Sequence, residues 1–166
     1  MNKHYKQVRD FHEAFGHEQA NTPTEIDYST ALNRAIWTGE ELVEFLYATV
    51  DGNKEEFSRT LNEFHKGLDK AAVKTIEKNP DVDNKLVAQM DALTDVSYFN
   101  YGSFAVAGVD PEPLFDIVQD ANMGKLWEDG KPRYREEDNK IQKPPYWEFL
   151  YAPEAKLEAE IERQSK

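Results

Sequence analysis

Three glutamates, Glu40, Glu41 and Glu44, stand close together in a stretch that contains no basic residue between Arg34 and Lys54. Acidic residues on solvated helices usually have Lys or Arg three or four positions away, where the opposite charges attract. These glutamates have no such neighbour, although the sequence around them is apolar and helical in its spacing. Their negative charge must therefore be neutralised by another group, and a divalent metal ion is the best candidate.

Asp91 and Asp95 repeat this pattern, because no Lys or Arg lies between Lys85 and Lys125. In an α-helix, residues three or four positions apart share a face, with Cβ atoms about 5–6 Å apart. Crowded carboxylates raise one another's pKa and destabilise the fold unless a cation neutralises them. We expect Mg²⁺, which prefers oxygen ligands. The competing interpretation is that all of these acids lie on solvated helix faces.

A third element contains Asn122 and Lys125, which is the first basic residue after Lys85. An amide that orients phosphate oxygens and an ammonium that meets phosphate as a point charge would suit a nucleotide. Alternatively, the segment Asn122-Met123-Gly124 is a helix C-terminus, and Lys125 is favourably placed against the helix dipole. The sequence leaves both interpretations open.

The elements that must position these residues are helices. Apolar residues recur at helical spacing along the chain, and no segment shows convincing strand alternation. Asn79-Pro80-Asp81 and Gly108-Val109-Asp110-Pro111 are typical of helix breaks. We predict one all-α domain over 1–166, a bundle of about five helices and a short closing helix, with irregular sequence from about 124. The expected helices cover about residues 3–15, 30–50, 54–78, 83–107, 111–122 and 153–164.

The composition narrows the class of protein. With 166 residues, 39% hydrophobic residues and no Cys, the chain can form a core but has no disulfide framework and no thiolate ligand. A net charge of −12 argues against binding nucleic acid or an anionic membrane through a basic surface. The sequence shows no apolar signal core and no membrane-spanning run. We expect a cytoplasmic protein with neither nucleic-acid nor membrane partners.

Apolar residues also surround the segment 30–50 on more than one face, as Trp37, Phe45 and Ala48 show. A helix that is apolar around much of its circumference is usually buried on several sides. This pattern predicts self-association.

With these motifs, the chain resembles the MazG-like all-α nucleoside triphosphate pyrophosphohydrolases, and among them the phosphoribosyl-ATP pyrophosphohydrolase-like branch. Their signature is Glu-Glu-x-x-Glu on one helix and Glu-x-x-Asp on a later helix. The sequence from Glu40 to Glu44 matches the first half in full. In the second half Asp95 matches, but Ala92 replaces the Glu. Asp91 lies one position earlier, where it shares a face with Asp95.

Further short motifs follow in the order of that branch and extend the resemblance over about residues 8–147. Each is weak alone, but the ordered series is fairly specific. The motifs are Val8-Arg9-Asp10-Phe11-His12-Glu13-Ala14-Phe15, Tyr101-Gly102, Asp110-Pro111, Asn122-Met123-Gly124-Lys125-Leu126, Asp129-Gly130-Lys131-Pro132 and Lys143-Pro144-Pro145-Tyr146-Trp147.

The resemblance implies Mg²⁺-dependent hydrolysis of a nucleoside triphosphate, or a related nucleotide, to the monophosphate and pyrophosphate. It also implies a homodimer or homotetramer, and Mn²⁺ is an alternative metal. The implied metal ligands are Glu41, Glu44, Asp91 and Asp95. Glu40 is the candidate base for the attacking water, or a further ligand, and Glu41 is the second catalytic residue. The implied phosphate-binding residues are Asn122, Lys125 and, as a weaker candidate, Lys143.

Two other functions remain open. The first is a homologue that binds a nucleotide or metal with little or no turnover and has a regulatory role, which the departure at Ala92 favours. The second is a helical interaction protein whose acids are simply solvated. Metal-dependent pyrophosphate release separates the enzyme from both.

Overall fold

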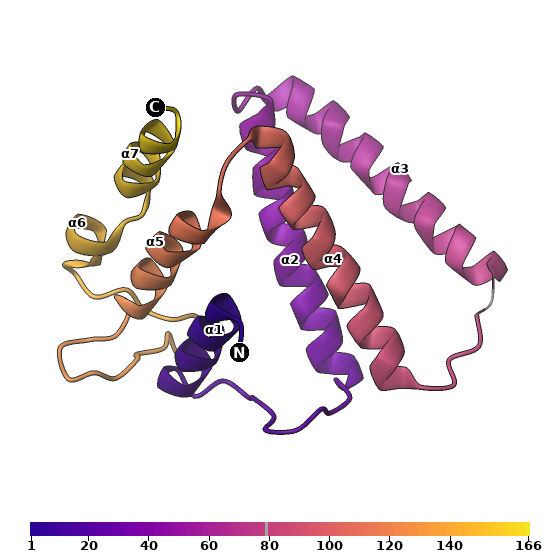
Figure 1. Ribbon diagram of the computed structural model, residues 1–166, viewed down its shortest axis with the longest axis horizontal. Helices are drawn as coiled ribbons and strands as arrows, with labels where there is room; N and C mark the ends of the chain where they lie inside the picture. Colours follow the sequence, from indigo (N-terminus) through magenta and orange to yellow (C-terminus); the bar gives the residue numbers. More distant parts are fainter. Residues whose placement is uncertain (79) are drawn as a thin grey trace. The chain divides into compact units, whose positions relative to one another are not determined.

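The computed structural model describes residues 1–78 and 80–166, and these residues form helices joined by turns and loops (Figure 1). Within them, the one β feature is an isolated bridge between Tyr134 and Ile141. The predicted all-α class is confirmed, and so are the six predicted helices. A further short helix, α6, was not predicted. The elements are α1 (Lys3–Ala14), α2 (Tyr28–Thr49), α3 (Lys54–Lys78), α4 (Lys85–Ala107), α5 (Pro111–Met123), α6 (Trp147–Tyr151) and α7 (Glu154–Gln164).

The chain divides into two compact units, which are described separately below. One consists of 1–22 together with 93–166, and the other of 23–92. The boundary at 92/93 falls inside α4. The expectation of a single domain stays a prediction.

The unit of residues 23–92 contains the hairpin of α2 and α3. Helix α2 begins slightly earlier than expected because the Asp27 carboxylate accepts a hydrogen bond from the backbone N–H of Thr30. A hydrogen bond from the Ser29 hydroxyl, together with this capping bond, holds the pKa of Asp27 well below its usual range. The α2–α3 turn contains Gly52 at φ +68°, a conformation that favours glycine.

The start of α4 is tied to the segment before α2 within the same unit. The Gln89 amide donates to the carbonyl of Ile26 at 2.7 Å, and its oxygen accepts from the N–H of Ile26 at 2.9 Å. Lys85 and Glu25 form an exposed ion pair at 3.5 Å. Helix α4 starts later than predicted because Asn84 accepts a hydrogen bond from the N–H of Val87. Of the predicted break at Asn79-Pro80-Asp81, Asn79 lies outside the described residues, and Pro80 and Asp81 are not helical.

The other unit is built around α5. Helix α1 packs on α5, where Lys3 bridges Glu112 at 3.0 Å and Asp116 at 2.7 Å, and Gln7 donates to Asp116 at 2.7 Å. The pKa of Asp116 is lowered chiefly by its hydrogen bond from Lys3. The buried apolar residues of the described chain all belong to this unit, and they include Phe15, Ala121, Pro144 and Trp147.

Helices α6 and α7 complete the packing around α5. The buried Trp147 indole donates to the carbonyl of Ala121 at 2.7 Å. Gly124, which ends α5, lies against the Tyr151 ring of α6, so closely that a Cβ there would approach Tyr151 Cγ to 2.2 Å. These contacts explain why α6 exists although its five residues are too few to show a helical period. No helix within the described residues has the length and apolar character needed to span a membrane.

Candidate functional site

Glu40, Glu41 and Glu44 lie in the second half of α2 and are all exposed. None of the three carboxylates forms a hydrogen bond or ion pair with any residue that the structure describes. The preceding cation on α2, Arg34, has its guanidinium 5.2 Å from the centre of the Trp37 ring. The absence of basic partners that the sequence predicts is therefore seen in the described part of the chain.

Asp91 and Asp95 lie one turn apart on α4, and both are exposed. Their carboxylates likewise have no hydrogen bond or ion pair within residues 1–78 and 80–166. The helix that contains them is unusually open, because every residue from Met90 to Gly108 is exposed. The substituted motif position, Ala92, belongs to the same exposed stretch.

The donor chemistry of these five carboxylates fits Mg²⁺, which takes hard oxygen ligands. Across the described residues, however, no group of three or more acidic or histidine side chains is arranged to hold a metal ion. Neighbouring positions such as Glu40 and Glu41 point about 100° apart around a helix, so one helix alone cannot converge three ligands. The metal site stays a prediction.

Asn122 and Lys125, predicted to bind phosphate, are brought together at the end of α5. The Lys125 ammonium donates to the Asn122 side-chain oxygen at 2.7 Å, and both residues are half-buried. The N–H of Gly124 donates to the carbonyl of Asp120 and ends the helix. This geometry fits the helix-terminus interpretation, in which the cation meets the negative end of the dipole. The phosphate-binding role stays a prediction.

Lys143, the weaker phosphate-binding candidate, is exposed, and its ammonium lies 3.7 Å from the centre of the Trp147 ring. Trp147 in turn bonds to Ala121, the neighbour of Asn122. The three predicted phosphate-binding residues therefore belong to one region, around the C-terminus of α5.

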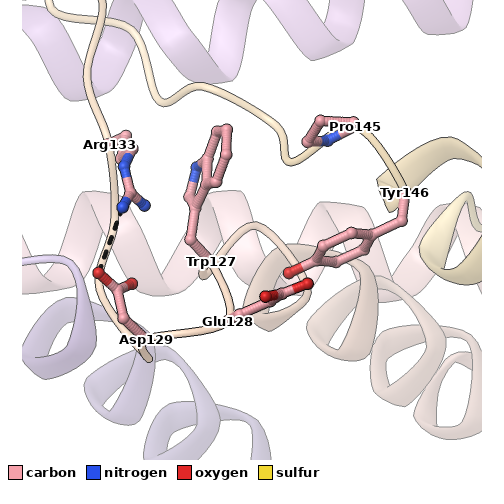
Figure 2. Close-up of a pocket in the computed structure, with 6 residues that line it drawn as sticks. All are labelled: Trp127, Glu128, Asp129, Arg133, Pro145 and Tyr146. Carbon is pink, nitrogen blue, oxygen red and sulfur yellow. Dashed lines mark hydrogen bonds and ion pairs between the residues drawn. The ribbon is translucent and has the colours of Figure 1, made fainter.

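A cavity in the C-terminal segment was not predicted, because the stretch after about residue 124 reads as irregular sequence. Its volume is about 360 Å³. Figure 2 shows its walls, with Trp127 between Arg133 on one side and Tyr146 on the other. The density of aromatic residues and prolines around 127–147 was the available signal. The lining residues are Trp127, Glu128, Asp129, Arg133, Pro145 and Tyr146.

Comparisons with known proteins agree with the family resemblance. The profile of the phosphoribosyl-ATP pyrophosphohydrolase family matches residues 8–122. A crystal structure of a candidate NTP pyrophosphohydrolase from Exiguobacterium sp. 255-15 is 45% identical in sequence, with a TM-score of 0.89 over 99% of this chain and 96% of that one. No curated protein matches the sequence. The predicted resemblance is confirmed, and the chain belongs to the phosphoribosyl-ATP pyrophosphohydrolase family.

Proposed function

We propose that this protein is a cytoplasmic enzyme that hydrolyses a nucleoside triphosphate, or a related nucleotide, to the monophosphate and pyrophosphate in a Mg²⁺-dependent reaction. Membership of the family supports hydrolysis of a nucleotide pyrophosphate bond. The observation that carries the finer proposal is the intact Glu-Glu-x-x-Glu motif on α2, whose carboxylates are exposed and have no basic partner among the described residues. Such a group of anions is ready to accept a cation.

In this proposal Mg²⁺, or Mn²⁺ in its place, neutralises the phosphates and lowers the pKa of the attacking water. The chain's own part is to hold the metal and the reactants. Glu40 accepts the proton of the attacking water or adds a ligand, and Glu41 combines ligation with a catalytic role. Asn122, Lys125 and, more weakly, Lys143 bind phosphate oxygens. The proposed metal ligands are Glu41, Glu44, Asp91 and Asp95.

We also propose that a second copy of this chain covers α4, in a homodimer or homotetramer. The support is the apolar character of the exposed helix, where Phe99 is 72% and Val106 is 92% exposed. Large contiguous apolar surfaces are rare on monomeric proteins and mark interaction sites. Such an assembly would bury the helix that contains Asp91 and Asp95.

The test of the activity is pyrophosphate release from a panel of canonical, deoxy- and modified nucleoside triphosphates, with and without Mg²⁺ or Mn²⁺. Glu44→Gln and Asp95→Asn keep the side-chain shape and remove one charge each. We expect each to lower turnover by more than about 100-fold, since even residues that only support metal ligands cost about 10- to 100-fold. Glu63→Gln, on exposed α3, is the matched control. Turnover that persists in both variants, or without metal, would refute the proposal.

A homologue with little or no turnover is the second candidate function, and Ala92 is the observation that favours it. The variant Ala92→Glu restores the family's Glu-x-x-Asp motif and adds a carboxylate one turn before Asp95. If the wild-type enzyme is limited by this missing carboxylate, Ala92→Glu will raise metal-dependent turnover. Nucleotide binding without turnover in the wild type would instead support the second candidate.

A further inference from the structure

One wall of the cavity is the Trp127 indole, which is held in place by contacts with Gln142 and Arg133. The Trp127 indole N–H donates to the carbonyl of Gln142 at 3.3 Å. The Arg133 guanidinium lies 4.4 Å from the centre of the Trp127 ring, and Asp129 holds that guanidinium through an ion pair at 3.3 Å. In Figure 2, Arg133 and Tyr146 lie on opposite sides of Trp127. One face of the indole is therefore covered by the guanidinium, and the other faces the cavity.

The opposite wall is formed by Tyr146 and Pro145, which precede the buried Trp147. In Figure 2 the Tyr146 hydroxyl points toward Glu128. Burial raises the pKa of Tyr146 above its usual value, and the neighbouring carboxylates of Glu128 and Asp129 raise it further. The phenol consequently remains protonated at neutral pH and can donate a hydrogen bond.

The two carboxylates of the cavity differ in what they already bind. Asp129 accepts from the backbone N–H of Lys131 at 3.1 Å and pairs with Arg133. Glu128 forms no hydrogen bond or ion pair with any residue in the described part of the chain. An ionised carboxylate only accepts hydrogen bonds. Glu128 is thus an exposed acceptor at the edge of the cavity that Trp127 and Tyr146 also line.

These features select a flat ligand with N–H donors at its edge. A ring stacks on Trp127 and Tyr146, and its amino group donates to Glu128. A small organic cation would be attracted by Glu128 but repelled by the Arg133 guanidinium on the far face of Trp127, whereas a neutral base meets no such repulsion. A carbonyl oxygen directed at Glu128 would also be repelled. Carboxylates recognise cytosine through its amino group for the same reason.

We infer that this cavity binds a nucleobase that has an exocyclic amino group, with the ring stacked between Trp127 and Tyr146 and the amino group hydrogen-bonded to Glu128. Adenine, cytosine and guanine meet this requirement, whereas uracil and thymine do not. The inference goes beyond the proposed hydrolysis. It concerns residues downstream of the family match at 8–122, and it requires neither metal nor phosphate.

The test measures nucleoside binding by calorimetry, without metal, so that phosphate and metal ligands play no part. We expect cytidine and adenosine to bind the wild-type protein at least tenfold more tightly than uridine. Glu128→Gln should reduce this preference to within about threefold, because an amide donates to a carbonyl as readily as it accepts from an amine. Glu137→Gln, an exposed acid outside the cavity, is the matched control and should leave the preference unchanged.

Variants of Trp127 test the contribution of stacking on the aromatic wall. Trp127→Leu should weaken the binding of all nucleosides by about 5- to 150-fold, since base stacking on an aromatic side chain is worth about 1–3 kcal/mol. Trp127→Phe retains a ring and should restore most of the binding if Trp127→Leu perturbs the fold. Equal binding of uridine and cytidine, tighter binding of arginine amide than of any nucleoside, or an unchanged preference in Glu128→Gln would each overturn the inference.

A second arm identifies the source of the base. If nucleosides compete with nucleotide hydrolysis, the cavity receives the base of the substrate itself. If they bind without competing, the cavity is a separate nucleoside site, and both results support the inference. Failure of the proposed hydrolysis would leave the binding measurement intact. Conversely, the protein could hydrolyse nucleotides while showing no preference for an amino group and no effect of Glu128→Gln. That result would support the proposed hydrolysis and refute the base-binding site.

Discussion

Apolar side chains are buried within the chain around α5, α6 and α7, whereas in α4 they are exposed. Around α5, Trp147 is only 5% exposed, and its indole N–H bonds to a backbone carbonyl. In α4, the aromatic and aliphatic side chains from Met90 to Gly108 are all exposed, on every face of the helix. The first region is stabilised by contacts within one chain. The second has the composition of a core helix, yet its side chains are exposed within the described residues, and the proposed second copy of the chain would cover them.

The largest effect within the α5 region should come from Trp147→Ala. Removal of the buried indole creates a cavity and leaves the carbonyl of Ala121 without its donor, so we expect a loss of about 3–5 kcal/mol in the free energy of unfolding. Urea denaturation at a fixed protein concentration measures it. Phe149→Ala, at a side chain that is 91% exposed, should change stability by less than about 0.5 kcal/mol. Equal losses in both variants would show that the contrast in burial is wrong.

Phe99→Glu tests the other side of the comparison. If a second copy buries Phe99, each copy loses about 1.5–3 kcal/mol of apolar burial, so a dimer loses about 3–6 kcal/mol, which corresponds to at least about 100-fold weaker association. Each copy also gains a buried charge. Sedimentation velocity should show dissociation, while circular dichroism shows that helicity is retained. Asn62→Glu adds the same charge to exposed α3 and should leave the assembly intact. A wild-type protein that is monomeric at all concentrations would contradict the proposal.

Gly124→Ala should destabilise the contact between α5 and α6. The new Cβ would meet the Tyr151 ring, with Cγ at 2.2 Å, so we expect a loss of about 1–3 kcal/mol in the free energy of unfolding. Gly67→Ala is the control, because outside the backbone of its own helix no atom of the described residues lies within 4 Å of its Cβ position on α3. That variant should instead stabilise the protein by about 0.5–1 kcal/mol, since alanine favours the helix. The two variants are therefore expected to change the free energy of unfolding in opposite directions, and a gain in stability for Gly124→Ala would contradict the close contact with Tyr151.

The smallest effect concerns the polar contact between α1 and α5. The pKa of Asp116 is lowered in the folded state, so its contribution is present above the unfolded pKa of about 3.9 and is lost as the pH falls through the folded value. Asp116→Asn should cost about 0.2–1 kcal/mol at pH 7, because the pair with Lys3 is largely exposed. The cost should vanish in strong acid, and Asp120→Asn should show neither effect. A cost that is independent of pH would exclude this role of Lys3.

The sequence predicts most of the fold because the long helices have clear periods and capping residues. The observed starts of α2 and α4 differ from the predicted starts by about two residues, because the capping side chains of Asp27 and Asn84 determine where the first turn begins. Helix α6 was not predicted because it depends on the burial of Trp147, which results from tertiary packing. Local interactions are readable in a sequence, whereas contacts across the chain are not.

The candidate site shows the same division. The unpaired state of Glu40, Glu41 and Glu44 could be predicted from the composition around them. The placement of Asn122 and Lys125 at one helix end could also be predicted, but the hydrogen bond between them was not. Convergence of metal ligands could not, because it requires side chains from separate helices to meet. The Trp127 cavity was not predicted either, because it joins a turn at 127–133 to residues that follow Pro144, and the aromatic residues and prolines of this segment were the only signal of it in the sequence.

The packing of α1 on α5 also constrains the order of folding. The ion pair between Lys3 and Asp116 joins residues that are 113 positions apart, and the unit of residues 23–92 lies between them in sequence. The entropy of closing so long a loop must be overcome before this pairing contributes. We therefore expect the α2–α3 hairpin to gain protection first and α1 to dock late. Pulsed hydrogen exchange that finds α1 protected before α3 would reverse this order.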